Sequence, residues 1–249
     1  METIAILNQK GGVAKTTTAH AIAAGLHAKG HKVLMVDLDG QRSLSVITGA
    51  EAAAPSAFDV LMRRTPTERA IKRCLCGDII VADDTLTASD TLLKDTGREY
   101  RLREALQPIR SVYDYCIVDC PPSLGILTIN ALTAADSCIV PAQADYLSLQ
   151  AIAQLHDTVR TVQTYTNNAL KVKGIVITRY NGRAILSREL VEMIEDKAAE
   201  IGTKVYSAKI RECIAVKEAQ AVHQSIFDYA PKSNAAKDYA ALVGEIERG

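Results

Sequence analysis

Short apolar runs of strand length alternate along the chain with segments whose apolar residues recur at helical spacing. The apolar runs cover residues 4–7, 31–39, 78–82, 113–119, 137–141 and 173–178. Helical spacing appears over residues 16–29, 99–112, 148–164, 187–201 and 234–246, and more briefly over 58–64 and 67–75, while residues 50–57 are typical of a loop. This alternation predicts an α/β fold, a doubly wound and mostly parallel sheet flanked by helices, with ligands at the carboxyl ends of the strands.

Composition agrees with one such domain spanning residues 1–249. Hydrophobic residues make up 48% of the chain, with no Trp and two Phe, which suits aliphatic helices packed on a parallel sheet. Cys116 and Cys138 lie inside apolar runs, where a thiol acts as a small hydrophobic group. There is no signal peptide ahead of the first strand and no apolar run of about 18 residues, so we expect a cytoplasmic protein.

The first strand leads into a glycine loop and then into a helix. Gly11 and Gly12 end the apolar run, and Lys15-Thr16-Thr17 opens the helical pattern. Glycines let backbone N–H groups approach an anion, and a helix start adds unpaired N–H donors and the positive end of its dipole. The layout indicates a phosphate-binding loop, in which Lys15 reaches the β- and γ-phosphates and the Thr16 hydroxyl binds Mg²⁺.

The strict P-loop pattern, G-x-x-x-x-G-K-[ST], fails at Gln9 and Ala14. The loop instead fits K-G-G-V-x-K-T-T, with an additional Lys10. In this it resembles the deviant ParA/MinD family of P-loop ATPases, in particular the short, Soj-like ParA proteins that partition chromosomes and plasmids. The resemblance implies ATP and Mg²⁺ as ligands, with the phosphates held by Gly11, Gly12, Val13, Ala14, Lys15, Thr16 and Thr17. Ala14 replaces the family's usual glycine, so nucleotide affinity is the property that we expect it to affect.

Two acidic strand ends continue the resemblance. Asp37-Leu38-Asp39-Gly40-Gln41 corresponds to the family's D-x-D-P-Q block, with Gly40 in place of proline. The resemblance implies that Asp39 orients the attacking water and that Asp37 supports the Mg²⁺. Asp119-Cys120-Pro121-Pro122 corresponds to the D-x-P-P block, in which Asp119 holds Mg²⁺ together with Thr16.

The resemblance extends to the last third of the chain. It implies that Arg179, at the end of a strand, and Ile210, where family members often have proline, border the adenine. Residues 209–219 resemble a block whose basic residues face DNA, and we expect Arg183, Lys209, Arg211 and Lys217 to contact it. The charge distribution agrees, because residues 171–217 carry ten Lys or Arg against six Asp or Glu in a chain of zero formal net charge.

The leading hypothesis is therefore a nucleoid-associated partition ATPase that converts ATP and water to ADP and phosphate, slowly without its partner. The resemblance implies an ATP-bound sandwich homodimer in which Lys10 of one subunit reaches the phosphates of the other. This dimer binds double-stranded DNA without reading its sequence, and a ParB-like protein stimulates the hydrolysis that releases it.

Three alternatives remain open at this stage. A MinD-like membrane-cycling ATPase needs a basic amphipathic C-terminal helix, but acids outnumber bases over residues 237–249, so we expect no membrane partner. An iron–sulfur reductase needs suitably placed thiolates, for which Cys120 or the pair Cys74 and Cys76 are the candidates. A DNA-binding protein without turnover is the third, if Ala14 or Gly40 abolishes hydrolysis.

Overall fold

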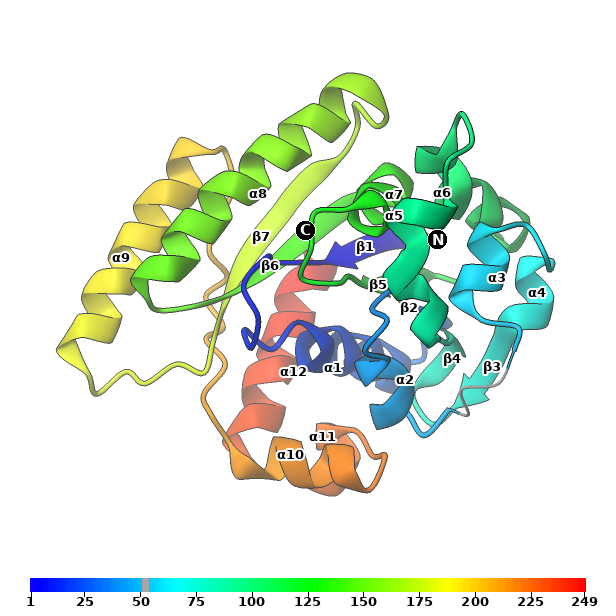
Figure 1. Ribbon diagram of the computed structural model, residues 1–249. Helices are drawn as coiled ribbons and strands as arrows, with labels where there is room; N and C mark the ends of the chain where they lie inside the picture. Colours follow the sequence, from blue (N-terminus) through cyan, green and yellow to red (C-terminus); the bar gives the residue numbers. More distant parts are fainter. Residues whose placement is uncertain (51–53) are drawn as a thin grey trace.

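The computed structural model describes residues 1–50 and 54–249. At its centre lies a seven-stranded sheet in the order β3-β4-β2-β5-β1-β6-β7 (Figure 1). Its strands are β1 (Glu2–Ile6), β2 (Val33–Asp37), β3 (Ile71–Cys74), β4 (Gly77–Ile80), β5 (Tyr115–Asp119), β6 (Ser137–Gln143) and β7 (Lys171–Thr178). β3 pairs antiparallel with β4, and the other neighbouring strands pair in parallel, which confirms the predicted doubly wound sheet.

Helices cover both faces of the sheet. The longer ones are α1 (Lys15–Ala28), α7 (Ile126–Ala134), α8 (Tyr146–Tyr165), α9 (Ile185–Glu200), α10 (Ile214–Ala221) and α12 (Asn234–Glu247). The shorter ones are α2 (Ser43–Ile47), α3 (Ala57–Leu61), α4 (Thr67–Ala70), α5 (Ser89–Leu92), α6 (Arg101–Leu106) and α11 (Ile226–Tyr229). Single 3₁₀ turns are η1 (Asp84–Ala88), η2 (Arg98–Tyr100) and η3 (Gln107–Ile109).

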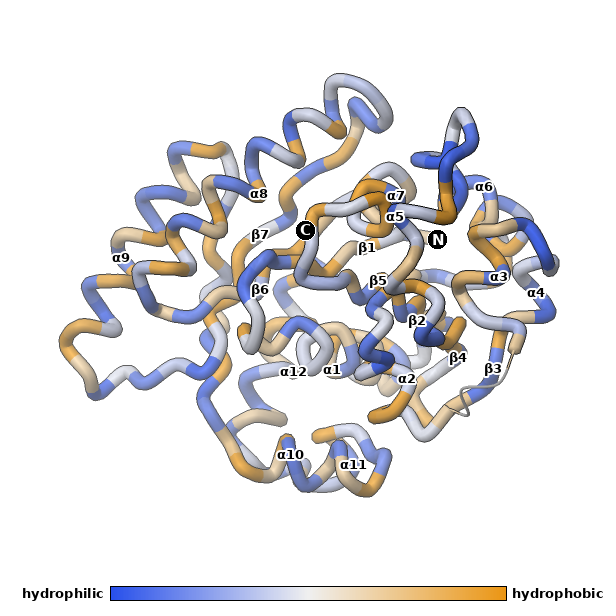
Figure 2. The backbone as a smooth tube through the Cα atoms, in the orientation of Figure 1, coloured by the Kyte–Doolittle hydropathy of each residue, from blue (hydrophilic) through white to orange (hydrophobic). Residues whose placement is uncertain are grey.

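Each face of the sheet has its own hydrophobic core. Along β1, Ala5 belongs to the core under α3, α6, α7, α8 and α9, whereas Ile4 and Ile6 belong to the core under α1 and α12. This alternation follows from the two-residue period of a strand, and burial on both sides explains why the strands are almost wholly apolar. In Figure 2, hydrophilic and hydrophobic residues alternate along α8 and α9, as expected for helices with one buried face.

The C-terminal helix packs on the sheet as its apolar spacing predicts. Tyr239, Leu242, Val243 and Ile246 are all buried against the core that contains α1. The apolar face of α12 is therefore covered by the protein itself. No helix among residues 1–50 and 54–249 combines the length and the apolar character that a membrane crossing requires.

The structure corrects several predicted elements. The helix expected over residues 67–75 ends at Ala70, and Ile71–Cys74 forms the antiparallel edge strand β3, because a tight turn brings it against β4. The helix expected over 99–112 is regular only in α6 and tightens into a 3₁₀ turn at Pro108, which has no N–H to continue the helix. Of the loop predicted over 50–57, residues 51–53 lie outside the described part of the chain.

Candidate functional site

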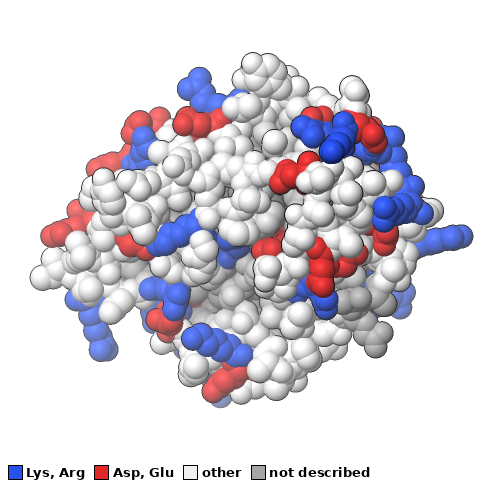
Figure 3. All heavy atoms as spheres, viewed as in Figure 1, with Lys and Arg blue, Asp and Glu red and all other residues white. Residues whose placement is uncertain are grey.

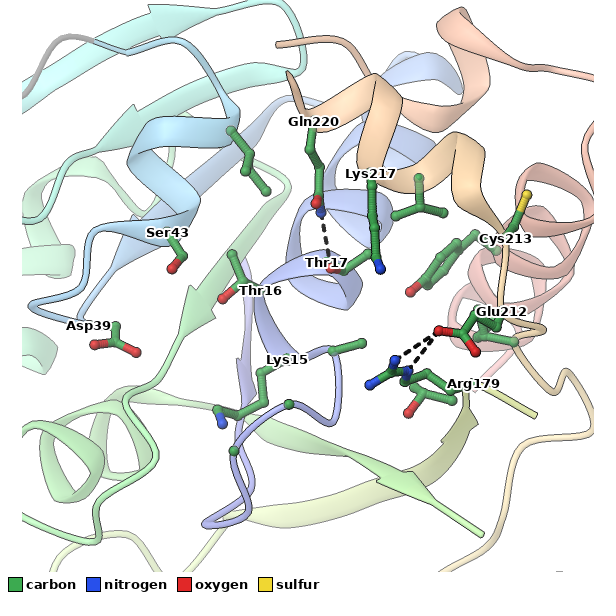
Figure 4. Close-up of a pocket in the computed structure, with 18 of the residues that line it drawn as sticks. Lys15, Thr16, Thr17, Asp39, Ser43, Arg179, Glu212, Cys213, Lys217 and Gln220 are labelled. Atoms are coloured by element: carbon green, nitrogen blue, oxygen red, sulfur yellow. Dashed lines mark hydrogen bonds and ion pairs between the residues drawn. The ribbon is translucent and has the colours of Figure 1, made fainter. Parts of the chain in front are cut away.

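The carboxyl ends of β1, β2 and β7 open onto one cavity of about 790 Å³. Its lining comes from the glycine loop and the start of α1, from Asp39, from Arg179 after β7, and from the segment 210–220 that leads into α10. Figure 4 shows Lys15, Thr16 and Thr17 between Asp39 on one side and the pair Arg179–Glu212 on the other. The fold thus brings together segments that are up to about two hundred residues apart in the sequence.

The glycine loop turns sharply before α1. Gly12 has φ +76°, and Ala14, the residue that precedes α1, has φ 63° and ψ 34°. The methyl group of Ala14 cannot accept a hydrogen bond from the N–H groups in the first turn of α1. Ala14 O accepts the first α-helical hydrogen bond from Thr18 N, at 2.9 Å. The N–H groups at the start of α1 are therefore left for an external acceptor, which makes this helix end an anion site.

Neighbouring strands hold the loop in place. Gln143 Nε2, at the end of β6, donates to Gly12 O at 3.0 Å. Thr178 Oγ1, at the end of β7, donates to Val13 O at 3.1 Å. The loop is therefore preorganised by side-chain bonds rather than by its own sequence alone.

Lys15 lies beneath the loop with only 9% of its surface exposed. Its Nζ donates to Lys10 O at 3.2 Å. Burial lowers the pKa of Lys15, and the nearby carboxylates of Asp119 and Asp39 oppose this by favouring the ammonium form. The side chain is thus a charged donor at the cavity floor.

Asp37 and Asp119 stand side by side at the ends of β2 and β5, where they are register partners, and both are fully buried. Asp37 is satisfied by the protein: Ser45 N and Oγ donate to Oδ2 at 2.8 and 2.7 Å, and Asp39 N donates to Oδ1 at 3.1 Å. Burial nevertheless raises the pKa of Asp37 to about 6. Asp37 thus holds the Asp39 segment, and its predicted support of Mg²⁺ stays a prediction.

Asp119 differs, because neither of its buried carboxylate oxygens has a hydrogen-bond partner among the described residues. Burial and the adjacent Asp37 raise the pKa of Asp119 well above its usual range, while the Thr16 hydroxyl and Lys15 oppose the shift. An unpartnered carboxylate beside a threonine hydroxyl is an oxygen donor set that suits Mg²⁺, which typically takes one or two carboxylates, substrate phosphates and water. The residues present therefore fit a magnesium ion at Thr16 and Asp119.

The opposite end of the cavity carries the two predicted adenine neighbours. Arg179 has φ 52°, and its Nη2 donates to Glu212 Oε1 at 2.8 Å. Ile210 is buried and donates its N–H to Ile177 O at 2.8 Å. Both residues line the cavity, and their contact with adenine stays a prediction.

α10 also contributes to the cavity, whereas the resemblance of residues 209–219 implied contacts with DNA and, near Ile210, with adenine. Gln220 Nε2 donates to Thr17 Oγ1 at 3.0 Å, and Val216 adds an apolar wall. Val216 lies within residues 209–219, for which the resemblance implied roles only for Ile210 and the basic residues, and Gln220 follows that block.

Comparison with known proteins agrees with this geometry. Residues 1–172 match a family described as an AAA domain. The chromosome partitioning protein ParA of Caulobacter vibrioides is 38% identical over 253 residues, covering 99% of this chain and 94% of that protein. The sporulation initiation inhibitor protein Soj of Bacillus subtilis is 38% identical over 248 residues, covering 98% and 97%. The chain belongs to the ParA/MinD family of P-loop ATPases.

A solved structure is similar over the same length. It is described as cobyrinic acid a,c-diamide synthase from Mycobacterium smegmatis with bound ATP analog and magnesium. It is 33% identical, with a TM-score of 0.88, and the alignment covers 100% of this chain and 95% of that one.

The four predicted DNA contacts of this ParA/MinD-family chain lie in different surroundings. Arg183 lies exposed in the turn before α9. Lys209 Nζ lies 5.6 Å from the centre of the Tyr180 ring. Arg211 Nη2 donates to Asp238 Oδ1 at 2.6 Å, and Lys217 extends toward Thr17 at the cavity (Figure 4). Figure 3 shows Lys and Arg interspersed with Asp and Glu on the face that carries the site. DNA contact by these residues stays a prediction.

The cysteines considered as iron–sulfur ligands lie in two places, because β2 separates Cys120, after β5, from the β3–β4 turn with Cys74 and Cys76. Cys120 is 1% exposed behind Asp119, and burial raises the pKa of its thiol well above the usual value. Cys74 lies on the edge strand β3, and Cys76 Sγ lies 3.5 Å from His20 Nε2. Within the described residues, no group of three or more His, Cys, Asp or Glu side chains is placed to hold a metal ion.

Proposed function

We propose that this chain is a partition ATPase that binds ATP with Mg²⁺ in the cavity above α1 and hydrolyses it to ADP and phosphate. The observation that carries the proposal is the buried Asp119, whose carboxylate has no hydrogen-bond partner within residues 1–50 and 54–249 and lies near Lys15 and Thr16 at the start of a helix. A buried anion of this kind needs a cation, and an uncapped helix start with a lysine needs an anion. Mg²⁺ with a nucleotide triphosphate satisfies both.

The residues then take distinct roles. The loop from Gly11 to Thr17 and the ammonium of Lys15 hold the phosphates, and Thr16 with Asp119 holds the Mg²⁺. Bound Mg²⁺ neutralises charge on the phosphates. Asp39, which lines the cavity on the side away from Arg179, orients the attacking water.

The partition cycle rests on a homodimer. Lys10 lies on the partly exposed rim of the loop, where its Nζ is paired with Asp145, and in the ATP-bound dimer it reaches the phosphates of the second subunit. A cation supplied in trans is worth about 10³–10⁵ in rate in enzymes that use an arginine finger. The ATP-bound dimer binds double-stranded DNA without sequence preference, and a ParB-like partner stimulates the hydrolysis that releases it. The names of the Caulobacter vibrioides and Myxococcus xanthus relatives, both chromosome partitioning proteins, support this assignment.

Substitution of Lys15 tests the proposal directly. Lys15→Ala removes a charged hydrogen-bond donor from a buried phosphate site, so ATP affinity should fall about 10- to 150-fold, the range for hydrogen bonds to charged groups. Lys29→Ala, at the other end of α1 and paired with Glu247, is the control and should bind like the wild type. Calorimetric titration with ATP and Mg²⁺ measures both. Equal affinity in Lys15→Ala and the wild type would remove the basis of the assignment.

Asp39→Ala separates binding from turnover. The variant should keep ATP affinity, because Lys15, Thr16 and Asp119 remain, and should lose hydrolysis, leaving the dimer on DNA. ATP turnover and retention on DNA are measured together, with and without a ParB-like partner. If the variant does not bind ATP, Asp39 holds the metal or the fold and another residue orients the water.

A further inference from the structure

A short segment outside the cavity contacts both the loop that carries Asp39 and the loop that follows Asp119. This bridge segment, residues 84–92, consists of η1 and α5, and none of its residues lines the cavity. One of the two loops follows β2 and contains Asp39, and the other follows β5 and contains Pro121 and Pro122. In Figure 1, α5 lies beside α7, the helix that the second loop enters.

The first contact is between Gly40 and Thr87. A Cβ added to Gly40 would lie 2.5 Å from Thr87 Cγ2 and 3.2 Å from Thr87 N, so the two backbones are packed as closely as a glycine allows. Two residues further on, Arg42 Nη1 pairs with Asp84 Oδ1 at 3.3 Å. The bridge segment therefore lies directly on the chain that follows Asp39.

From the other side, the Asp39 loop is held by the sheet. Asp39 N donates to Asp37 Oδ1 at 3.1 Å, and Asp39 O accepts from Arg42 N at 2.8 Å. The loop is thus enclosed between the buried end of β2 and the bridge segment. A shift of the bridge segment changes where the Asp39 carboxylate points.

The second contact is between Asp90 and the start of α7. Asp90 Oδ1 accepts from Ile126 N at 2.8 Å, and a Cβ on Gly125 would lie 2.6 and 2.9 Å from the two Asp90 oxygens. Gly125 has no side chain with which to cap the helix, so a carboxylate from the bridge segment takes that role. The loop after β5 is therefore fastened at its far end to the same segment as the Asp39 loop.

The bridge segment itself is anchored in the core. Leu86 and Ser89 are each 1% exposed, and Leu93, immediately after the segment, is 3% exposed. Just before it, Asp83 Oδ2 accepts from Ser56 Oγ at 2.5 Å. A segment fixed at three buried points transmits a displacement from one end to the other rather than absorbing it.

We infer that the bridge segment sets the position of the Asp39 loop relative to the loop after β5, with Thr87 and Asp90 as positioning residues for hydrolysis. The inference rests on the proposed role of Asp39 in orienting water. Neither residue touches the cavity, so their loss slows turnover and leaves ATP affinity unchanged. The two loops then respond to the γ-phosphate as one unit.

Asp90 variants test the inference. Asp90→Ala should lower kcat about 10-fold, the effect of one lost charge-assisted hydrogen bond, with less than about a twofold change in ATP affinity. Asp90→Asn keeps an oxygen that accepts from Ile126 N and should retain kcat within about twofold. Thr91→Ala, an exposed neighbour on α5, is the matched control. An unchanged kcat in Asp90→Ala, or a parallel loss of ATP affinity, would overturn the inference.

Hydrogen exchange gives a readout that does not depend on turnover. In Asp90→Ala, amides of residues 38–42 should exchange faster although Asp90 does not contact them. Faster exchange confined to the start of α7 would refute the coupling, whatever the activity. A wild type that neither binds nor hydrolyses ATP would instead refute the proposed function, so the two failures are distinguishable.

A pair of substitutions examines the Gly40 contact. Gly40→Ala places a methyl group against Thr87 and should lower kcat, and adding Thr87→Ala removes the 2.5 Å clash and should restore part of it. Additive effects of the two changes would show that the contact does not position Asp39.

Discussion

Ala14 offers the sharpest test of how the loop is built. It has φ 63° and ψ 34°, the left-handed region, and it immediately precedes α1. A residue with a Cβ costs about 1–2 kcal/mol in this conformation, whereas glycine adopts it freely. Ala14→Gly therefore relieves strain at the edge of the phosphate site.

The net effect on stability is smaller than the strain. Glycine also makes the unfolded chain more flexible, which opposes the gain by about 0.4–1 kcal/mol. The free energy of unfolding should therefore rise by about 0.5–1 kcal/mol, or about 1–4 °C in Tm for a chain of this size. If residue 14 has this conformation both before and after ATP binds, the strain opposes folding alone, and ATP affinity should change by less than about threefold, which corresponds to under about 1 kcal/mol.

Thermal and urea unfolding, with ATP titration at one temperature, measure the two quantities separately. Ala24→Gly, in the middle of α1, is the matched control and should destabilise the fold by at least about 1 kcal/mol, since glycine is a poor helix former and the site is buried. Destabilisation by Ala14→Gly would refute the strain argument. A tenfold gain in ATP affinity without a change in stability would show that residue 14 becomes left-handed only on binding.

Three further predictions concern other parts of the site. Asp145→Asn keeps a side chain that caps α8 but removes the charge that pairs with Lys10. Since a partly exposed ion pair contributes about 1 kcal/mol, the ATP-dependent dimer should form at up to about fivefold lower protein concentration in sedimentation experiments. Unchanged dimerisation would contradict this. Burial lowers the pKa of His20 from 6.5 to about 4, so the folded protein holds this side chain in its neutral form. The resulting stability is fully present above pH 6.5. The free energy of unfolding of the wild type should therefore fall by about 1.4 kcal/mol per pH unit as the pH drops from 6.5 toward 4. His20→Gln should lack this component of the slope in urea unfolding. Gly40→Pro, which restores the family's usual residue, should lower Tm because its ring atoms meet Thr87.

The sequence predicted the elements whose residues carry their own signal. Glycines followed by Lys15 mark the loop whatever surrounds it, and apolar runs ending in Asp37 and Asp119 mark two buried parallel strands. Because parallel strands end at one edge, these residues were expected to meet, and the structure places them there.

What the sequence did not predict depends on long-range pairing. Ile71–Cys74 has no strand signal of its own and becomes β3 only because β4 lies beside it. The bond from Gln220 to Thr17 joins residues 203 positions apart. Gly40 in place of the family's proline was unexplained until the structure placed Thr87 against it.

On the proposed function, the charges of the site would link ATP hydrolysis to the association of two subunits. In the single chain the Lys10 ammonium is paired with Asp145, while the buried Lys15 faces Asp119 and Asp39. On the proposed function, phosphates bound to one subunit meet the ammonium of Lys15 and a Mg²⁺ ion at Thr16 and Asp119, while the ammonium of Lys10 stays with Asp145. In the proposed dimer, Lys10 would leave Asp145 and add a further cation in a cavity from which water is excluded, where one charge is worth more than at the surface. On the proposed function, the same pair that keeps Lys10 in place in the monomer therefore keeps hydrolysis slow until the dimer forms.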